Sequence, residues 1–199
     1  MRGGVPRILA SFVQDTLASI DAIDPELGRR VRAALKPRVR DEIENAWGAT
    51  WLPISHDVEL TERFFALAGE EQACDVMRNN LSATFEKPIL RPMLDGALRL
   101  FGTRTEGLLR WAPRAWSLIF RDAGEMHVEA REGEASILLR GLPLEVSESR
   151  PYLLGTAAAL SALFGLTQVT GSCRLASQDA GEARFELCWT SAGDGMPVA

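Results

Sequence analysis

One stretch near the carboxyl end of the chain decides the fold. It runs from Arg150 to Trp189 and reads RPYLLGTAAALSALFGLTQVTGSCRLASQDAGEARFELCW. Its first part predicts a helix over 151–165, in which Gly155 and several alanines recur at spacings of three and four. Small side chains at that spacing let a helix backbone lie close against a sheet. Leucines and Phe164 fill most of the remaining positions, so we expect this helix to be buried.

Two strands are expected after this helix, over 167–177 and 183–190. In the second strand Phe185, Leu187 and Trp189 alternate with other residues, which is the pattern of a strand with one buried face. Matching the apolar faces of the two strands places Cys173 opposite Leu187 or Trp189 and turns Cys188 to the other face. A disulfide between the two cysteines is therefore disfavoured.

The same alternation begins earlier, after Pro113. It predicts strands over 116–121, 126–131 and 135–140, separated by glycine-containing turns. With the late helix and hairpin, the order becomes β-β-β-α-β-β. The predicted fold class is α+β, with N-terminal helices packed on one face of a four- to five-stranded antiparallel sheet.

Helical spacing of apolar residues dominates the first half of the chain. It predicts helices over 5–23, 25–35, 38–47, 57–69, 70–85, 93–101 and 105–111. Ser55 or Asp57 can cap the fourth of these helices. We divide the chain into a helical N-terminal arm (1–50), an α+β ligand-binding-like domain (51–191) and a loose tail (192–199).

Charge and composition disfavour several classes of protein. The chain has 199 residues, a formal net charge of -5 and a pI near 5.2, which gives no electrostatic footprint for nucleic acid. No apolar run reaches the roughly 18 residues that a membrane span needs, and no secretory signal is visible. We therefore expect a cytoplasmic protein without a transmembrane segment. The three cysteines lack the short spacing of a zinc cluster or a disulfide scaffold.

No catalytic or metal-binding constellation is visible in the sequence. His56 and His127 lie far apart, and no second histidine or cysteine lies one helical turn from either of them, so we expect no metal. Nucleophile elbows and phosphate-binding glycine loops are also missing. We assign no catalytic residue and expect no cofactor. An enzyme would need a cleft with converging polar groups, such as Tyr152, Arg150 and a carboxylate.

Aromatic residues are in surplus near the predicted sheet, and they could line a cavity for an apolar ligand. The alternative is that they pack together as a solid core. Tyr152 is the only tyrosine, and it lies where a helix N-terminus could help to orient a ligand head group. The candidate ligand-binding residues are Phe64, Phe85, Trp116, Phe120, Arg150, Tyr152 and Trp189.

The chain also resembles a known group of domains. The resemblance rests on Trp51-Leu52-Pro53, on the run from Leu98 to Arg114, on Pro151 with Leu154-Gly155, and on the closing strand Arg184 to Trp189. The pattern is similar to the haem–nitric-oxide-binding fold, the 4-vinyl reductase domain and the TRAPP-type trafficking subunits. Within that group it resembles a paralogous family of unknown function abundant in myxobacteria. The resemblance implies a ligand-binding or scaffold domain, often dimeric, with a cavity between helices and sheet.

This sequence departs from the group in two places. Haem members use an axial histidine and a Tyr-x-Ser-x-Arg motif, whereas here Ser147-Glu148-Ser149-Arg150-Pro151-Tyr152 has those pieces in another order. Neither histidine is expected on a helix that faces the cavity, so haem is not expected either. The cysteine cluster of 4-vinyl reductase domains is missing, and neither a reductase nor a metal role carries over.

The sequence therefore predicts a non-enzymatic sensory or regulatory domain that binds a small apolar molecule and forms a homodimer. One alternative is an oligomerisation or scaffold protein without a ligand, with Phe12, Trp47 and Trp51 carrying the interface. A haem-binding sensor is the further alternative.

Overall fold

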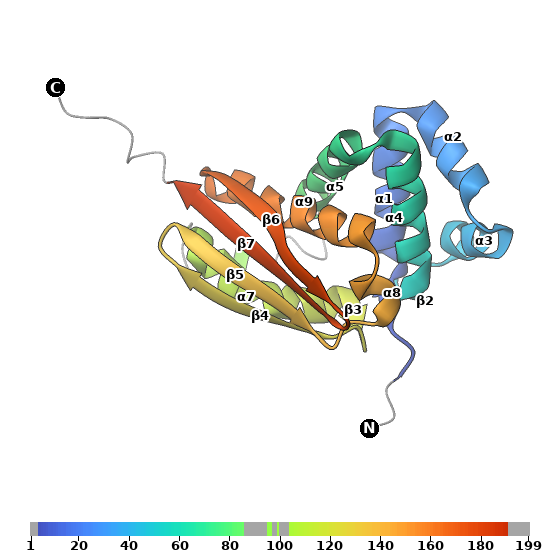
Figure 1. Cartoon of the computed structure of the whole chain (residues 1–199). Coiled ribbons are helices and arrows are strands. Elements are labelled where there is room, and N and C mark those ends of the chain that lie inside the picture. The colour runs from blue at the N-terminus through green and yellow to red at the C-terminus, as the bar shows by residue number, and fades with distance from the viewer. Residues whose placement is uncertain (1–3, 86–94, 97–98, 100–103, 191–199) are drawn as a thin grey trace.

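Helices and two antiparallel sheets make up the α+β fold that the sequence predicts (Figure 1). The computed structural model describes residues 4–85, 95–96, 99 and 104–190, with residues 82–85 described by their backbone alone. The helix expected over 93–101 falls largely outside these residues. Within the described residues, no helix combines the length and the apolar character that crossing a bilayer requires.

The larger sheet has four strands in the order β4-β5-β7-β6, and all neighbours are antiparallel. Its strands are β4 (Glu125–Arg131), β5 (Glu134–Arg140), β6 (Thr170–Asp179) and β7 (Glu182–Thr190). Alternate residues of β7 are buried, among them Phe185 and Leu187. Of the two partners expected for Cys173, the structure pairs it with Leu187, and Cys188 is exposed on the other face.

Two helices lie against this sheet (Figure 1). The helix α7 (Thr105–Ile119) packs against β4, and α9 (Arg150–Thr167) packs against β6. Behind α9 lies α5 (Glu70–Phe85). A Cβ atom added at Gly155 would lie 3.2 Å from Cε of Met77, so the small residues of α9 permit a close approach to α5. At Gly155 the close neighbour is thus another helix, where the sequence indicated a sheet.

Another helix, α1 (Ala10–Ile23), packs against α5, and further helices complete the described helical part. They are α2 (Pro25–Ala34), α3 (Pro37–Asn45), α4 (Ile54–Ala68) and the single turn α8 (Leu144–Ser147). Asp24 caps α2, because its carboxylate accepts hydrogen bonds from the backbone N–H groups of Glu26 and Leu27 at 2.9 and 3.1 Å. Pro25 takes the first helical position of α2, where its missing N–H group costs no hydrogen bond.

The smaller sheet was not predicted. It has the order β2-β1-β3, with β1 (Arg7–Leu9) between β2 (Trp51–Pro53) and β3 (Phe120–Arg121). The expectation of a helix from residue 5 is wrong at its beginning, since residues 7–9 pair as a strand with both neighbours. The Arg121 guanidinium lies 3.9 Å from the centre of the Trp51 ring, a cation–π contact that joins the two outer strands.

The strand expected over 116–121 is also wrong for most of its length. The helix α7 does not end at Pro113 but continues to Ile119. In the expected strand, only Phe120 and Arg121 are extended. Leu109 and Trp116 are both buried, and their separation of two helical turns places them on one face of the helix. Burial of that face outweighs the hydrogen bond that proline removes from the helix. The larger sheet therefore has four strands, at the lower end of the expected range.

Candidate functional site

A cavity of about 120 Å³ lies between the helices and the larger sheet. Its wall combines residues of α1, α4, α5, α7 and α9 with Phe120 and with Met126 of β4. The helix α7 contributes one continuous stripe: Leu108, Trp111, Ala112, Ala115, Trp116 and Ile119. From α9 come Tyr152, Gly155, Thr156, Ala159, Leu160 and Leu163. Most of these side chains are apolar, and the small ones on the two helices leave room between them.

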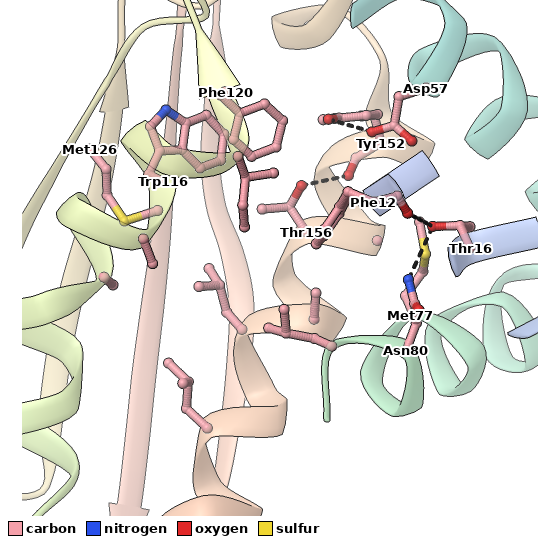
Figure 2. A pocket seen from close by; sticks show the side chains of 18 of the residues that line it. Phe12, Thr16, Asp57, Met77, Asn80, Trp116, Phe120, Met126, Tyr152 and Thr156 are labelled. Atoms are coloured by element: carbon pink, nitrogen blue, oxygen red, sulfur yellow. Dashed lines mark hydrogen bonds between the residues drawn. The ribbon is translucent and has the colours of Figure 1, made fainter. Parts of the chain in front are cut away.

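Three aromatic rings form one side of the cavity. Trp116 and Phe120 stack with ring centres 3.9 Å apart, and Phe12 meets Phe120 edge-on at 6.4 Å. The indole N–H of Trp116 donates to the backbone oxygen of Gly124 at 3.3 Å. Figure 2 shows Trp116, Phe120 and Met126 together on this side of the space. The aromatic side therefore presents apolar surface to anything inside the cavity.

A buried carboxylate faces this space from the opposite side (Figure 2). Asp57 on α4 is 4% exposed, and its Oδ2 accepts a hydrogen bond from the Tyr152 hydroxyl on α9 at 2.9 Å. Burial raises the pKa of Asp57 to about 6, although the hydrogen bond from Tyr152 acts to lower it. Burial and the neighbouring Asp57 carboxylate raise the pKa of Tyr152 well above its usual value. Tyr152 therefore remains a hydrogen-bond donor at neutral pH.

A second polar group lies where α1 meets α5. The side-chain amide of Asn80 donates to the Thr16 hydroxyl at 3.0 Å, and its oxygen accepts from Ser19 at 3.0 Å. The Thr16 hydroxyl in turn donates to the backbone oxygen of Phe12 at 3.3 Å. The polar side chains in this part of the wall are therefore already hydrogen-bonded within the protein.

Of the seven candidate ligand-binding residues, the structure brings Trp116, Phe120 and Tyr152 to the cavity. Phe64 and Trp189 are buried elsewhere, each with its ring centre 6.2 Å from a neighbouring phenylalanine ring. Arg150 is exposed at the start of α9. Phe85 ends α5, and its side chain lies outside the described part of the structure. A role in ligand binding for any of these residues remains a prediction.

Sequence reasoning missed Asp57 as a cavity residue. The helix α4 begins at Ile54, three residues earlier than expected, and neither Ser55 nor Asp57 caps it. Asp57 lies one and two turns before the buried Leu60 and Phe64, so an acid on an apolar helical face was the available signal. The cavity residues Phe12, Thr16, Met77, Asn80 and Met126 were missed as well. Their common feature is a position on the buried face of an element, which by itself does not separate a cavity wall from a filled core.

Two of the three thiols, those of Cys74 and Cys173, are poor nucleophiles. Burial raises the pKa of Cys173 to about 12 and also raises that of Cys74, so both thiols are protonated at neutral pH. Among the residues that the structure describes, no three histidine, cysteine or acidic side chains are grouped to hold a metal ion. His56 contacts Glu42 at 2.7 Å, and His127 is exposed on β4.

Neither a protein-family model nor a curated protein sequence matches the chain. Solved structures do match it. An Fe(II) unliganded H-NOX protein from K. algicida has a TM-score of 0.65 and 8% identity, over 95% of this chain and 100% of the other. A mutant H-NOX protein from T. tengcongensis has a TM-score of 0.56 and 10% identity, over 96% and 98% of the two chains. An oxygen-binding H-NOX domain related to soluble guanylate cyclases, solved as its oxygen complex, has a TM-score of 0.55 and 11% identity over the whole of both chains.

The chain has the H-NOX fold. The identities are too low to carry over residue roles, so the likeness concerns the path of the backbone. It does bear out the expected relation to the haem–nitric-oxide-binding fold.

Haem is the group that the H-NOX fold implies, and the described cavity does not fit it. Both histidines of the chain are described, and neither lines the cavity. The thioethers of Met77 and Met126 line it, and methionine can be an axial ligand of haem iron. The volume of about 120 Å³ nevertheless lies below the roughly 300 Å³ at which sites for drug-sized ligands begin. The described space is therefore too small for a haem macrocycle, and we derive no chemistry through haem.

Proposed function

We propose that this chain is a non-enzymatic sensory or regulatory domain whose cavity binds a small apolar molecule. The observation that carries the proposal is the apolar cavity of about 120 Å³ between the helices and the larger sheet. An engineered apolar cavity of about 150 Å³ in another protein stays dry and binds benzene or xenon. A molecule with the bulk of one aromatic ring therefore matches this space, and the H-NOX fold adds support from neighbours that bind a ligand.

Binding in this cavity would act on several elements at once. The wall is built from helices of both halves of the chain, including Phe12 of α1, Met77 of α5 and Trp116 of α7. A ligand that contacts all of them favours the arrangement in which they surround it, and stabilises that arrangement in proportion to its occupancy. This is the physical basis on which a domain without catalytic groups reports the presence of a ligand.

Thermal-shift measurements with benzene, toluene and indole test the proposal, and native mass spectrometry of the purified protein tests for a retained ligand. We expect stabilisation by at least one of these molecules, and loss of that effect in Ala115→Leu, which places a larger side chain on the cavity stripe of α7. Ser117→Leu is the matched control, because Ser117 lies on the exposed face of the same helix. No retained ligand and no stabilisation by any probe would contradict the proposal.

Self-association is the second candidate function, and one observation favours it. Trp47 is 80% exposed, an unusual position for so large an apolar side chain. The other two residues suggested for an interface are partly buried, with Phe12 at the cavity and Trp51 beneath Arg121. Light scattering at high concentration tests a homodimer, and a Trp47→Ser variant shows whether this residue supports it. A cytoplasmic location remains part of the proposal, tested by cell fractionation.

A further inference from the structure

The cavity has one strongly polar feature that its ligand must accommodate. Asp57 is the one acidic residue among the described residues of the wall, and only 4% of its surface is exposed to solvent. Among the described residues, no lysine, arginine or histidine forms an ion pair with it. A buried carboxylate without a basic partner costs free energy, and an incoming positive charge or hydrogen-bond donor would offset that cost.

Tyr152 meets only part of what the carboxylate can accept. A carboxylate has two oxygens and about four acceptor positions, and the described residues supply one donor, the Tyr152 hydroxyl at 2.9 Å. That hydrogen bond also fixes the orientation of Asp57, since Tyr152 is itself buried on α9. The carboxylate is therefore held at the cavity wall with acceptor capacity to spare.

The other polar side chains of the wall already have hydrogen-bond partners within the protein. Thr16 and Asn80 are bonded to each other, and the Thr156 hydroxyl donates to the backbone oxygen of Tyr152 at 2.9 Å. Opposite Asp57 lie the stacked rings of Trp116 and Phe120 (Figure 2). Aromatic faces attract a cation electrostatically, so they suit an apolar body that ends in a positive charge.

We propose that the ligand of this cavity is a small apolar amine, whose ammonium group donates hydrogen bonds to Asp57 while its apolar body lies against Trp116 and Phe120. The proposal rests on the function proposed above and names the chemical class of the ligand. The ammonium gives up its hydration on entry, whereas the carboxylate has already lost its own on folding. The attraction between the two charges is strong because the apolar wall screens it poorly.

Benzylamine and ethylbenzene form a matched pair of probes, because they differ by an ammonium in place of a methyl group. Their binding to the purified protein is measured by isothermal titration calorimetry at pH 7.5, with Asp57→Asn as the near-isosteric variant. We expect Asp57→Asn to weaken benzylamine binding at least about tenfold, the effect of a hydrogen bond between charged groups. Ethylbenzene should bind the two proteins within about threefold of each other, since its contacts are with the apolar wall.

Each outcome decides one of the two proposals. Ethylbenzene binding without benzylamine binding, or benzylamine binding that Asp57→Asn leaves unchanged, would overturn the amine proposal and leave the apolar-ligand function intact. Failure of both probes to bind the wild-type protein would contradict the apolar-ligand function as well. Tyr152→Phe keeps the carboxylate, so retained benzylamine binding in that variant supports the amine proposal if Asp57→Asn fails to fold.

Discussion

Tyr152 on α9 donates a hydrogen bond to Asp57 on α4, with 2.9 Å between Oη and Oδ2 and 95 positions between the two residues in the chain. The pair joins the helix of the late half to a helix of the early half at the edge of an apolar cavity. Both side chains are buried, so the hydrogen bond is made in a medium where an unpaired carboxylate is costly. This single contact links the stability of the fold to the chemistry of the cavity.

The first prediction concerns the dependence of stability on pH. The pKa of Asp57 is raised from 3.8 to about 6 in the folded protein, so the folded state binds its proton more tightly than the unfolded state. The resulting stabilisation is fully present below pH 3.8 and is lost as the pH rises through about 6. The gap between the two pKa values corresponds to about 3 kcal/mol. Urea unfolding of the wild-type protein and of Asp57→Asn from pH 4 to pH 7.5 measures this change in the free energy of unfolding.

Asparagine does not titrate, so the difference between the two proteins isolates Asp57 from all other groups. We expect Asp57→Asn to gain stability relative to wild type as the pH rises from 4 to 7.5. If the two proteins followed parallel curves over this range, the carboxylate would not be desolvated as the geometry indicates.

The second prediction concerns the hydrogen bond itself. Tyr152→Phe removes the donor and leaves the buried Asp57 carboxylate without its partner, so we expect a loss of about 1–3 kcal/mol at pH 7.5. The cost should be smaller at pH 4, where Asp57 is protonated. A double-mutant cycle with Asp57→Ala, which removes the acceptor that asparagine would keep, measures the coupling, and contacting pairs of this kind give about 0.5–3 kcal/mol. A coupling near zero would show that the two groups do not interact in solution.

The third prediction separates two glycines of α9. An alanine Cβ at Gly165 would meet nothing within 4 Å, so Gly165→Ala should raise the free energy of unfolding by about 1 kcal/mol through helix propensity. At Gly155 the same Cβ would lie 3.2 Å from Cε of Met77, and that strain offsets the gain. Chemical denaturation should therefore rank Gly165→Ala above Gly155→Ala. Equal stabilities would mean that α9 and α5 are not closely packed at Gly155.

The fourth prediction concerns the reactivity of the thiols. Cys188 is exposed on β7, whereas the pKa of Cys173 on the neighbouring strand is raised to about 12 by burial. Ellman's reagent at pH 8 should therefore react quickly at Cys188 and slowly at Cys173. A Cys188→Ser variant identifies the fast site, and labelling in denaturant gives the total. Rapid reaction in that variant would show that Cys173 or Cys74 is accessible.

The late half of the fold was predictable because its patterns are local. The alternation of Phe185, Leu187 and Trp189 indicates a strand with one buried face, and matching it to β6 leaves Leu187 or Trp189 as the partner of Cys173. The structure decides for Leu187. The segment 116–121 was not predictable in this way, because so short an apolar pattern fits both a helix and a strand. Burial of Trp116 on the same helical face as Leu109 decides between them, and that depends on the tertiary structure.

The cavity was predictable only in part. Of the aromatic residues that the sequence suggested for a cavity, the structure places Trp116, Phe120 and Tyr152 at its wall, whereas Phe64 and Trp189 pack in the core. The contact between Asp57 and Tyr152 spans so many positions that no local pattern contains it. Whether apolar side chains enclose a space or fill it is decided by their packing in three dimensions.

The space between Trp116, Tyr152 and Leu163 is empty of protein, and we propose that it admits an apolar molecule. A crystal structure determined under xenon pressure tests this most directly, because xenon enters dry apolar cavities and scatters strongly. We expect a xenon site bordered by the α7 stripe and α9, which Ala115→Leu abolishes. Side chains that fill this space, with no xenon among them, would contradict the account.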